Sequence, residues 1–183
     1  MKRTHHCYAL RPEHIGQEVT LEGWVHSNRD LGGVIFIDIR DREGRTQTVF
    51  DPSDLSDEIF KVAEAARSES VIRVTGTVRA RPDDTANTKI ATGEVEVLAN
   101  GIEMLNQAEV LPFQIDDPEA SAKVHEDHRL RHRYLDLRRP EMINNLKVRS
   151  KVATATRVFM EEQGFLEIET PTLFKSTPEG ARE

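Results

Sequence analysis

Residues 34–50 read VIFIDIR, DREG and RTQTVF in order, and this stretch decides the fold. The first and third segments alternate between two kinds of side chain, which is the period of a β-strand with one buried face. The DREG segment between them carries the Asp and Gly that favour a turn. We therefore expect an antiparallel hairpin. Its facing pairs are Arg40 with Arg45, Asp38 with Gln47, and Phe36 with Val49.

The same alternation assigns the two faces of this hairpin. An aromatic ring, Phe36, then lies on the outer face as a diagonal neighbour of the amide of Gln47. An exposed ring can stack an unpaired base, and an amide can both donate to and accept from a base edge. The alternative is that Phe36 is an ordinary exposed apolar residue. The interior face is expected to hold Ile35, Ile37, Ile39, Thr46, Thr48 and Phe50.

Three further strands and one helix are expected around the hairpin. Residues 19–27, 71–81 and 93–105 read as strands, with Gly23 and Gly76 at bulges or bends. Between residues 54 and 66, apolar side chains recur at helical spacing. Five strands with a helix between the third and fourth predict a β-barrel of the OB-fold class.

The remainder of the chain predicts a hinge and an incomplete second domain. We assign residues 1–105 to the barrel, 106–127 to an irregular hinge, and 128–183 to an α+β segment. In that segment, a helix over 141–163 follows Pro140, and a strand is expected over 165–170. A single strand has no sheet to join, so we expect this domain to be the start of a larger one.

Composition excludes several classes of protein. The net charge is −7, from 25 Lys and Arg against 32 Asp and Glu, which argues against nucleic-acid binding by bulk positive charge. The single cysteine, Cys7, excludes an internal disulfide and favours a reducing compartment. No apolar run approaches the length of a transmembrane helix. We expect a cytoplasmic protein with no membrane partner.

Several long sequence runs resemble one known family. In the first half these are GWV at 23–25, RDLGGVIFID at 29–38 and RDREG at 40–44. In the second half they are RYLDLRRP at 133–140, FLEIETP at 165–171 and STPEGAR at 176–182. Together they resemble the N-terminal part of bacterial-type aspartyl-tRNA synthetases, which are class II enzymes, and the similarity covers essentially the whole chain.

The resemblance implies a role for each residue of an anticodon-binding site. The residue at the position of Phe36 stacks the central anticodon base, and the residue at Gln47 reads that base, a uridine. The residue at Glu94 reads the first anticodon base, a guanosine or its queuosine derivative. Arg29 and Arg79 match basic positions that line the same site.

Two more positions carry implied roles. Members that charge both tRNA-Asp and tRNA-Asn often have His at the place of Leu31, so Leu31 favours the type that discriminates between the two tRNAs. Glu179 matches the position that contacts the ammonium group of aspartate. The helix after Pro140 and the strand at 165–170 match motif 1, which builds the homodimer interface.

The implied whole enzyme attaches aspartate to tRNA-Asp with ATP and Mg²⁺, through an aspartyl-adenylate. The family's ATP-binding arginines and magnesium ligands would follow residue 183. We therefore expect this chain to bind tRNA but to hold no ATP or Mg²⁺, to contain no catalytic residue, and to be inactive alone. The alternative function is a stand-alone OB-fold module that binds single-stranded nucleic acid.

A metal site is the weaker hypothesis for one histidine cluster. His125, His128 and His132 are spaced to share a helix face, and imidazoles at such spacing can bind Zn²⁺. The arginines at 129, 131 and 133 would repel a cation, and structural zinc sites favour cysteine. We therefore predict no metal site in this chain.

Overall fold

The computed structural model describes residues 2–82, 85–115 and 117–173, in two compact units. Unit 1 spans Met1–Leu111 and unit 2 spans Pro112–Glu183. Among the described residues, no helix has the length and apolar character needed to cross a membrane. The two units are described separately below.

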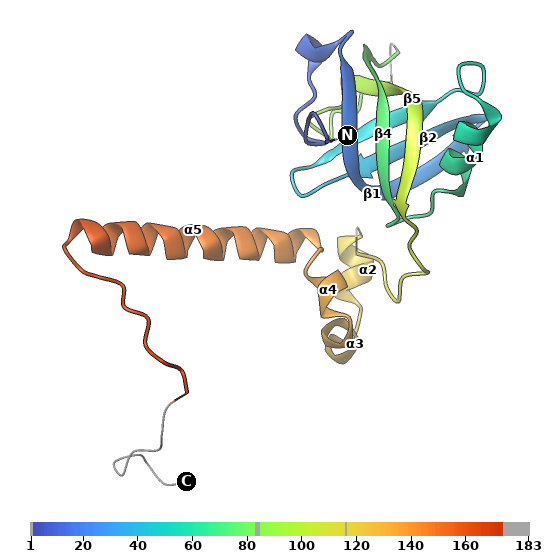
Figure 1. The fold of residues 1–183 in the computed structure, drawn as a ribbon. Coiled ribbons are helices and arrows are strands. Elements are labelled where there is room, and N and C mark those ends of the chain that lie inside the picture. Colours follow the sequence, from blue (N-terminus) through green and yellow to red (C-terminus); the bar gives the residue numbers. More distant parts are fainter. Residues whose placement is uncertain (1, 83–84, 116, 174–183) are drawn as a thin grey trace. The chain divides into compact units, whose positions relative to one another are not determined.

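Unit 1 is a closed five-stranded ring (Figure 1). Its strands follow the order β1-β2-β3-β5-β4, so each strand has a neighbour on both sides and the sheet closes on itself. All neighbours are antiparallel except β3 and β5, which run parallel. The strands are β1 (Glu18–Leu31), β2 (Val34–Arg40), β3 (Arg45–Phe50), β4 (Val71–Ala80) and β5 (Val95–Asn106).

The central hairpin has the predicted register, which confirms the assignment of its faces. Phe36 pairs with Val49, Asp38 with Gln47 and Arg40 with Arg45. Every residue predicted for the interior face is buried. The rest of the core comes from inward-facing apolar residues of the other strands, chiefly Val19, Leu21, Val25, Ile72, Val74, Val78, Val95 and Val97.

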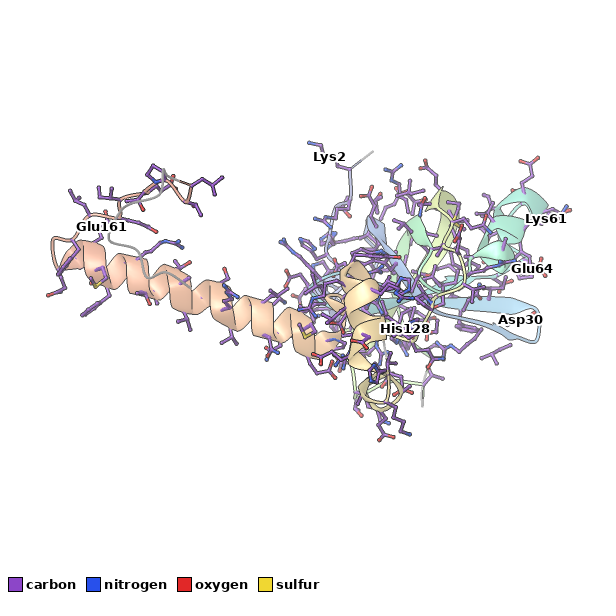
Figure 2. The ribbon with its side chains drawn as sticks, turned by 90° about the horizontal axis from the view of Figure 1, so that it is seen from below. Lys2, Asp30, Lys61, Glu64, His128 and Glu161 are labelled. Carbon is purple, nitrogen blue, oxygen red and sulfur yellow. The ribbon has the colours of Figure 1, made fainter. Side chains whose placement is uncertain are left out.

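Two details of the first strand differ from the sequence prediction. β1 extends to Leu31, because residues 28–31 pair with β2 as a ribbon closed by Gly32 and Gly33. Both glycines have positive φ, which the tight turn requires. The bulge in β1 lies between Val25 and Ser27, a short way beyond Gly23, where a bulge or bend was expected. Figure 2 shows Asp30 at the tip of this ribbon.

The helix α1 (Asp57–Ala65) follows β3 and packs against the barrel, and a short 3-10 helix, η1 (Pro12–His14), precedes β1. The N-terminus of α1 is capped by the Ser56 hydroxyl, which accepts from the backbone N–H of Ile59. At the other end, the amide of Asn28 donates to the carbonyls of Ala63 and Ala66, at 2.8 and 2.9 Å. The Asn28 side chain therefore links β1 to the C-terminal end of α1, where the last carbonyls have no partner within the helix.

A buried carboxylate, Asp41, helps to attach the N-terminal segment to the barrel, together with hydrogen bonds between Thr4 and Thr20 and between Thr46 and Cys7. The Asp41 side chain accepts from the backbone N–H of Cys7 at 2.9 Å and contacts the ring of His6 at 2.8 Å. It also accepts from the backbone N–H groups of Glu43 and Gly44 in its own turn. Burial acts to raise the pKa of Asp41, but these hydrogen bonds outweigh it and hold the pKa below its usual value.

Replacing this carboxylate is therefore expected to destabilise the barrel. Asp41→Asn should lower the free energy of unfolding by about 1–2 kcal/mol at neutral pH, because donors to a charged acceptor lose that acceptor. A carboxyl with a lowered folded-state pKa stabilises the fold above the unfolded pKa of about 3.9 and loses that effect as the pH falls through the folded value. The difference between wild type and Asp41→Asn in urea titrations should therefore shrink below about pH 4. A difference that grows on acidification would contradict this account.

Unit 2 is helical in its described residues. Its helices are α2 (Pro118–Ala122), α3 (Glu126–Arg131), α4 (Arg133–Asp136) and α5 (Pro140–Glu162). Helix α2 lies inside the stretch that was expected to be an irregular hinge. The fully buried Asp136 carboxylate accepts from three arginines, Arg129, Arg133 and Arg139, and these ion pairs join α3, α4 and the start of α5.

The prediction of a strand at residues 165–170 was wrong. Those residues have no regular secondary structure, and Phe165, Leu166 and Ile168 are exposed. A strand exists only when its backbone pairs with another strand, and the described part of unit 2 supplies none. Residues 165–170 therefore have the apolar sequence typical of a strand, but they have no partner strand in the described part of unit 2.

Candidate nucleic-acid interface

A row of polar side chains crosses all five strands on the outer face of the barrel. Asp38 pairs with Ser27 on β1 and with Gln47 on β3. On the other side, Glu96 of β5 pairs with Arg79 of β4. A hydrogen bond from Gln47 to Glu96 joins the two halves of the row.

Hydrogen bonds fix the central part of this row. The Gln47 amide nitrogen donates to Glu96 Oε2 at 2.8 Å, and Arg79 Nε donates to Glu96 Oε1 at 2.9 Å. From the opposite side, Arg29 Nη2 donates to Gln47 Oε1 and to Asp38 Oδ1, both at 3.3 Å. The amide is therefore held between a carboxylate and a guanidinium. The polar network is defined as Arg29, Asp38, Gln47, Glu96 and Arg79.

An apolar row lies beside the polar network. Phe36 pairs with Arg29 on β1 and with Val49 on β3, and Val49 pairs with Leu98 on β5. Phe36 and Leu98 are partly exposed, while Val49 between them is buried. An aromatic ring thus lies next to a hydrogen-bonding amide on a rigid sheet, which is the arrangement that can stack a base and read its edge.

Positive charge gathers around the polar network despite the negative charge of the chain. Burial lowers the pKa of Arg81, the charges of Arg29 and Arg45 lower it further, and the carboxylates of Glu96 and Asp38 oppose these effects. Arg45 Nη1 also lies 2.7 Å from Nε2 of His26. Because a guanidinium only donates, that imidazole nitrogen accepts. These arginines form a local basic patch that suits a phosphate backbone.

The structure brings four of the five predicted anticodon residues together. Phe36, Arg29, Gln47 and Arg79 lie in the two adjacent rows. Gln47 is only 9% exposed, because its amide is hydrogen-bonded to Glu96 on one side and to Arg29 on the other. Glu94 does not open the fifth strand but lies exposed in the turn before β5.

Two other predicted positions lie away from this network. Leu31 is 62% exposed at the end of β1, in the ribbon that Gly32 and Gly33 close. Glu179, predicted to contact the ammonium group of aspartate, lies outside the described residues.

Sequence reasoning missed Glu96 and Leu98, although a signal was present. Val95, Val97 and Ala99 are buried in the core, so the alternation of β5 places Glu96 and Leu98 on the outer face. Applying the strand period to the fifth strand as well as to the hairpin would have found both.

The histidine cluster of unit 2 contains ring contacts. The ring centroids of His128 and His132 lie 5.1 Å apart, and both rings contact Phe113 edge to face. His128 is labelled on α3 in Figure 2. Across the described ranges, no group of three or more His, Cys, Asp or Glu side chains is placed to hold a metal ion.

The fold and the outer face of unit 1 define an OB-fold domain of the kind that binds nucleic acid. Residues 19–105 match the tRNA anticodon family of OB-fold nucleic acid binding domains. Residues 125–183 match the class II tRNA synthetases of the D, K and N type. The chain therefore combines an OB-fold nucleic acid binding domain with part of a class II tRNA synthetase domain of the D, K and N type.

Individual relatives agree with this assignment. The chain is 56% identical over 182 residues to an aspartate–tRNA(Asp/Asn) ligase of Geotalea uraniireducens, and it covers 30% of that relative's length. The crystal structure of asparaginyl-tRNA synthetase from Pyrococcus horikoshii is 28% identical, with a TM-score of 0.79 over 93% of this chain and 38% of that one. The aspartyl-tRNA synthetase of Entamoeba histolytica is 26% identical, with a TM-score of 0.79 over 94% and 40% of the two chains.

Proposed function

We propose that unit 1 recognises the anticodon of tRNA-Asp as part of an aspartate–tRNA ligase. The observation that carries the proposal is the position of a partly exposed ring, Phe36, as the diagonal neighbour of a fixed amide, Gln47. Both lie inside a basic patch on an OB barrel. Base stacking supplies affinity, and hydrogen bonds to the base edge supply sequence choice. The match to anticodon-type OB domains supports the assignment of the ligand.

Each residue then has a distinct part in binding. Phe36 stacks the central anticodon base, and the carbonyl oxygen of Gln47 accepts from the imino N–H of that base, a uridine. Arg29 and Arg79 hold the Gln47 amide in place and bind the phosphate backbone of the anticodon loop. Glu94 is exposed before β5, where its carboxylate is free to accept from the amino and imino groups of the first anticodon base, a guanosine.

The activity of the whole protein is proposed from the family. It would attach aspartate to tRNA with ATP and Mg²⁺, and Glu179 would contact the amino acid. The described residues form no group suited to Mg²⁺, so no step is assigned to the metal here. The buried, free Cys7 is compatible with the cytoplasmic location that we propose.

A homodimer is proposed from the surface of the C-terminal helix. α5 contains no buried residue within this chain, and several of its large apolar side chains are exposed. Large apolar side chains exposed along a helix are candidates for burial against a partner. The apolar residues concerned are Leu146, Val148, Val152, Val158, Phe159 and Met160.

The range of tRNA substrates is proposed from the named relative and from Leu31. The Geotalea relative is named for both tRNA-Asp and tRNA-Asn, whereas Leu31 favours discrimination between them. Leu31 is accessible at the ribbon turn, so it can contact an RNA loop. We propose tRNA-Asp as the principal partner, with tRNA-Asn as the second substrate to be tested.

A binding titration tests the proposed function. The chain should bind a tRNA-Asp transcript more tightly than the same transcript with a swapped anticodon, and log Kd should rise with log salt by about 0.7 per phosphate contacted. Fluorescence anisotropy at several salt concentrations measures both quantities. Equal affinities would favour the second candidate, a generic OB module for single-stranded nucleic acid. The match of residues 125–183 to class II synthetases argues against that candidate.

A further inference from the structure

We infer that Glu96 is a positioning residue that fixes which end of the Gln47 amide faces the RNA. The inference rests on the proposed function and adds the source of its base selectivity. An amide has a donating end and an accepting end, and the two can exchange by rotation about the last side-chain bond. If the Gln47 amide were free to rotate, it would accept a hydrogen bond from one base and donate a hydrogen bond to another.

The two neighbours of Gln47 permit one orientation only. The ionised carboxylate of Glu96 only accepts, so it requires the NH₂ end, and the two atoms lie 2.8 Å apart. The guanidinium of Arg29 only donates, so it requires the oxygen end, at 3.3 Å. A rotated amide would place its oxygen against the carboxylate and its NH₂ against the guanidinium, which is unfavourable at both ends.

Glu96 is itself held rigidly enough to act in this way. It is 2% exposed, and Arg79 contacts its other oxygen through two nitrogens, each at 2.9 Å. These two contacts with the guanidinium hold the Glu96 carboxylate in one position. In contrast, Arg29, the partner on the oxygen side of the amide, is about half exposed, so a base can approach that side more readily than the side of the buried Glu96.

A fixed oxygen at this place selects bases by a simple rule. The amide oxygen has two lone pairs, so it can accept from a base while it accepts from Arg29. Uridine presents an N–H at its N3 position, whereas cytidine presents a lone pair there. The fixed amide therefore favours uridine over cytidine, two pyrimidines of the same size that stack alike on Phe36.

The test compares anticodon stem-loops that carry U or C at the central position, by fluorescence anisotropy with the full chain. In Glu96→Gln the new amide keeps its oxygen toward Arg79, which only donates, and turns its NH₂ toward Gln47, so the acceptor that requires the NH₂ end of Gln47 is lost. We expect the preference for U over C to fall by about tenfold, with a smaller change in the affinity for the U stem-loop. Glu96→Asp keeps an acceptor and should retain part of the preference.

A charge-conserving exchange separates positioning from simple structural support. The double variant Gln47→Glu with Glu96→Gln places a carboxylate where the amide oxygen stood, and that group only accepts. The preference for U over C should return in the double variant, and thermal melting by circular dichroism should show folded protein. If Glu96 had only a structural role, Glu96→Gln would weaken binding of both stem-loops equally. The double variant would then not restore the preference for U over C.

The outcomes distinguish the inference from the function on which it rests. Equal affinities of the wild type for matched and swapped anticodons would overturn the proposed function and the inference with it. A wild type that prefers U, together with a Glu96→Gln variant that keeps the full preference, would overturn the inference alone. If Glu96→Gln does not fold, the double variant decides, because loss of its U preference would overturn the inference.

Discussion

Phe36→Ala is expected to weaken binding of the matched anticodon stem-loop by about 1–3 kcal/mol, a factor of about 5 to 150 in Kd. The ring lies on the outer face of β2, between Arg29 and Val49, and it is partly exposed in the unbound protein. Stacking would remove one face of the ring and one face of the base from water. Alanine at this position keeps the strand but leaves the base without a platform.

A matched control exists two residues earlier on the same strand. Val34 also lies on the outer face of β2 and is partly exposed, but it pairs with Leu31 at the ribbon end rather than with the polar network. Val34→Ala should change Kd much less than Phe36→Ala, while Phe36→Trp should retain binding. Anisotropy titrations give the affinities, and urea titrations establish that each variant is folded. An unchanged Kd for Phe36→Ala would remove base stacking from the proposal.

The central hairpin was predictable because its information is local. The alternation of residues 34–40 and 45–50 sets which side chains face inward, and the short turn between them sets the register. Those two facts were enough to place Phe36 on the outer face and Ile37 in the core. The prediction of a barrel followed from the number and order of the strands.

The polar network could not be predicted in full, because it depends on pairing between distant segments. Gln47 and Glu96 meet only because β3 and β5 run parallel and close the ring, a pairing with no short connection to reveal it. The same holds for Asp41, which contacts Cys7 from a distant part of the chain. The false strand at residues 165–170 has the opposite cause, since the local pattern is present but no partner strand is described.

The second large effect is expected at Gly76, where two strand backbones approach too closely for any side chain. A Cβ at this position would lie 2.2 Å from the carbonyl oxygen of Leu98 and 2.8 Å from the Cα of Ala99. Both are backbone atoms of β5, so they cannot turn aside as a side chain can. The register of β4 against β5 shifts at this point, between Thr75 and Gly76, where the barrel bends.

Gly76→Ala should therefore lower the free energy of unfolding by about 2–4 kcal/mol, because relief of the clash requires the two strands to separate. The matched control is Gly101→Ala on the paired strand, whose Cβ would meet only the hydroxyl of Thr75, at 2.6 Å. That hydroxyl can rotate away, so the control should cost clearly less. Urea unfolding followed by circular dichroism measures both variants. Equal losses in the two would show that the close approach of β4 and β5 does not set the requirement for glycine at position 76. A smaller loss in Gly101→Ala would place that requirement in the backbone of β5 itself.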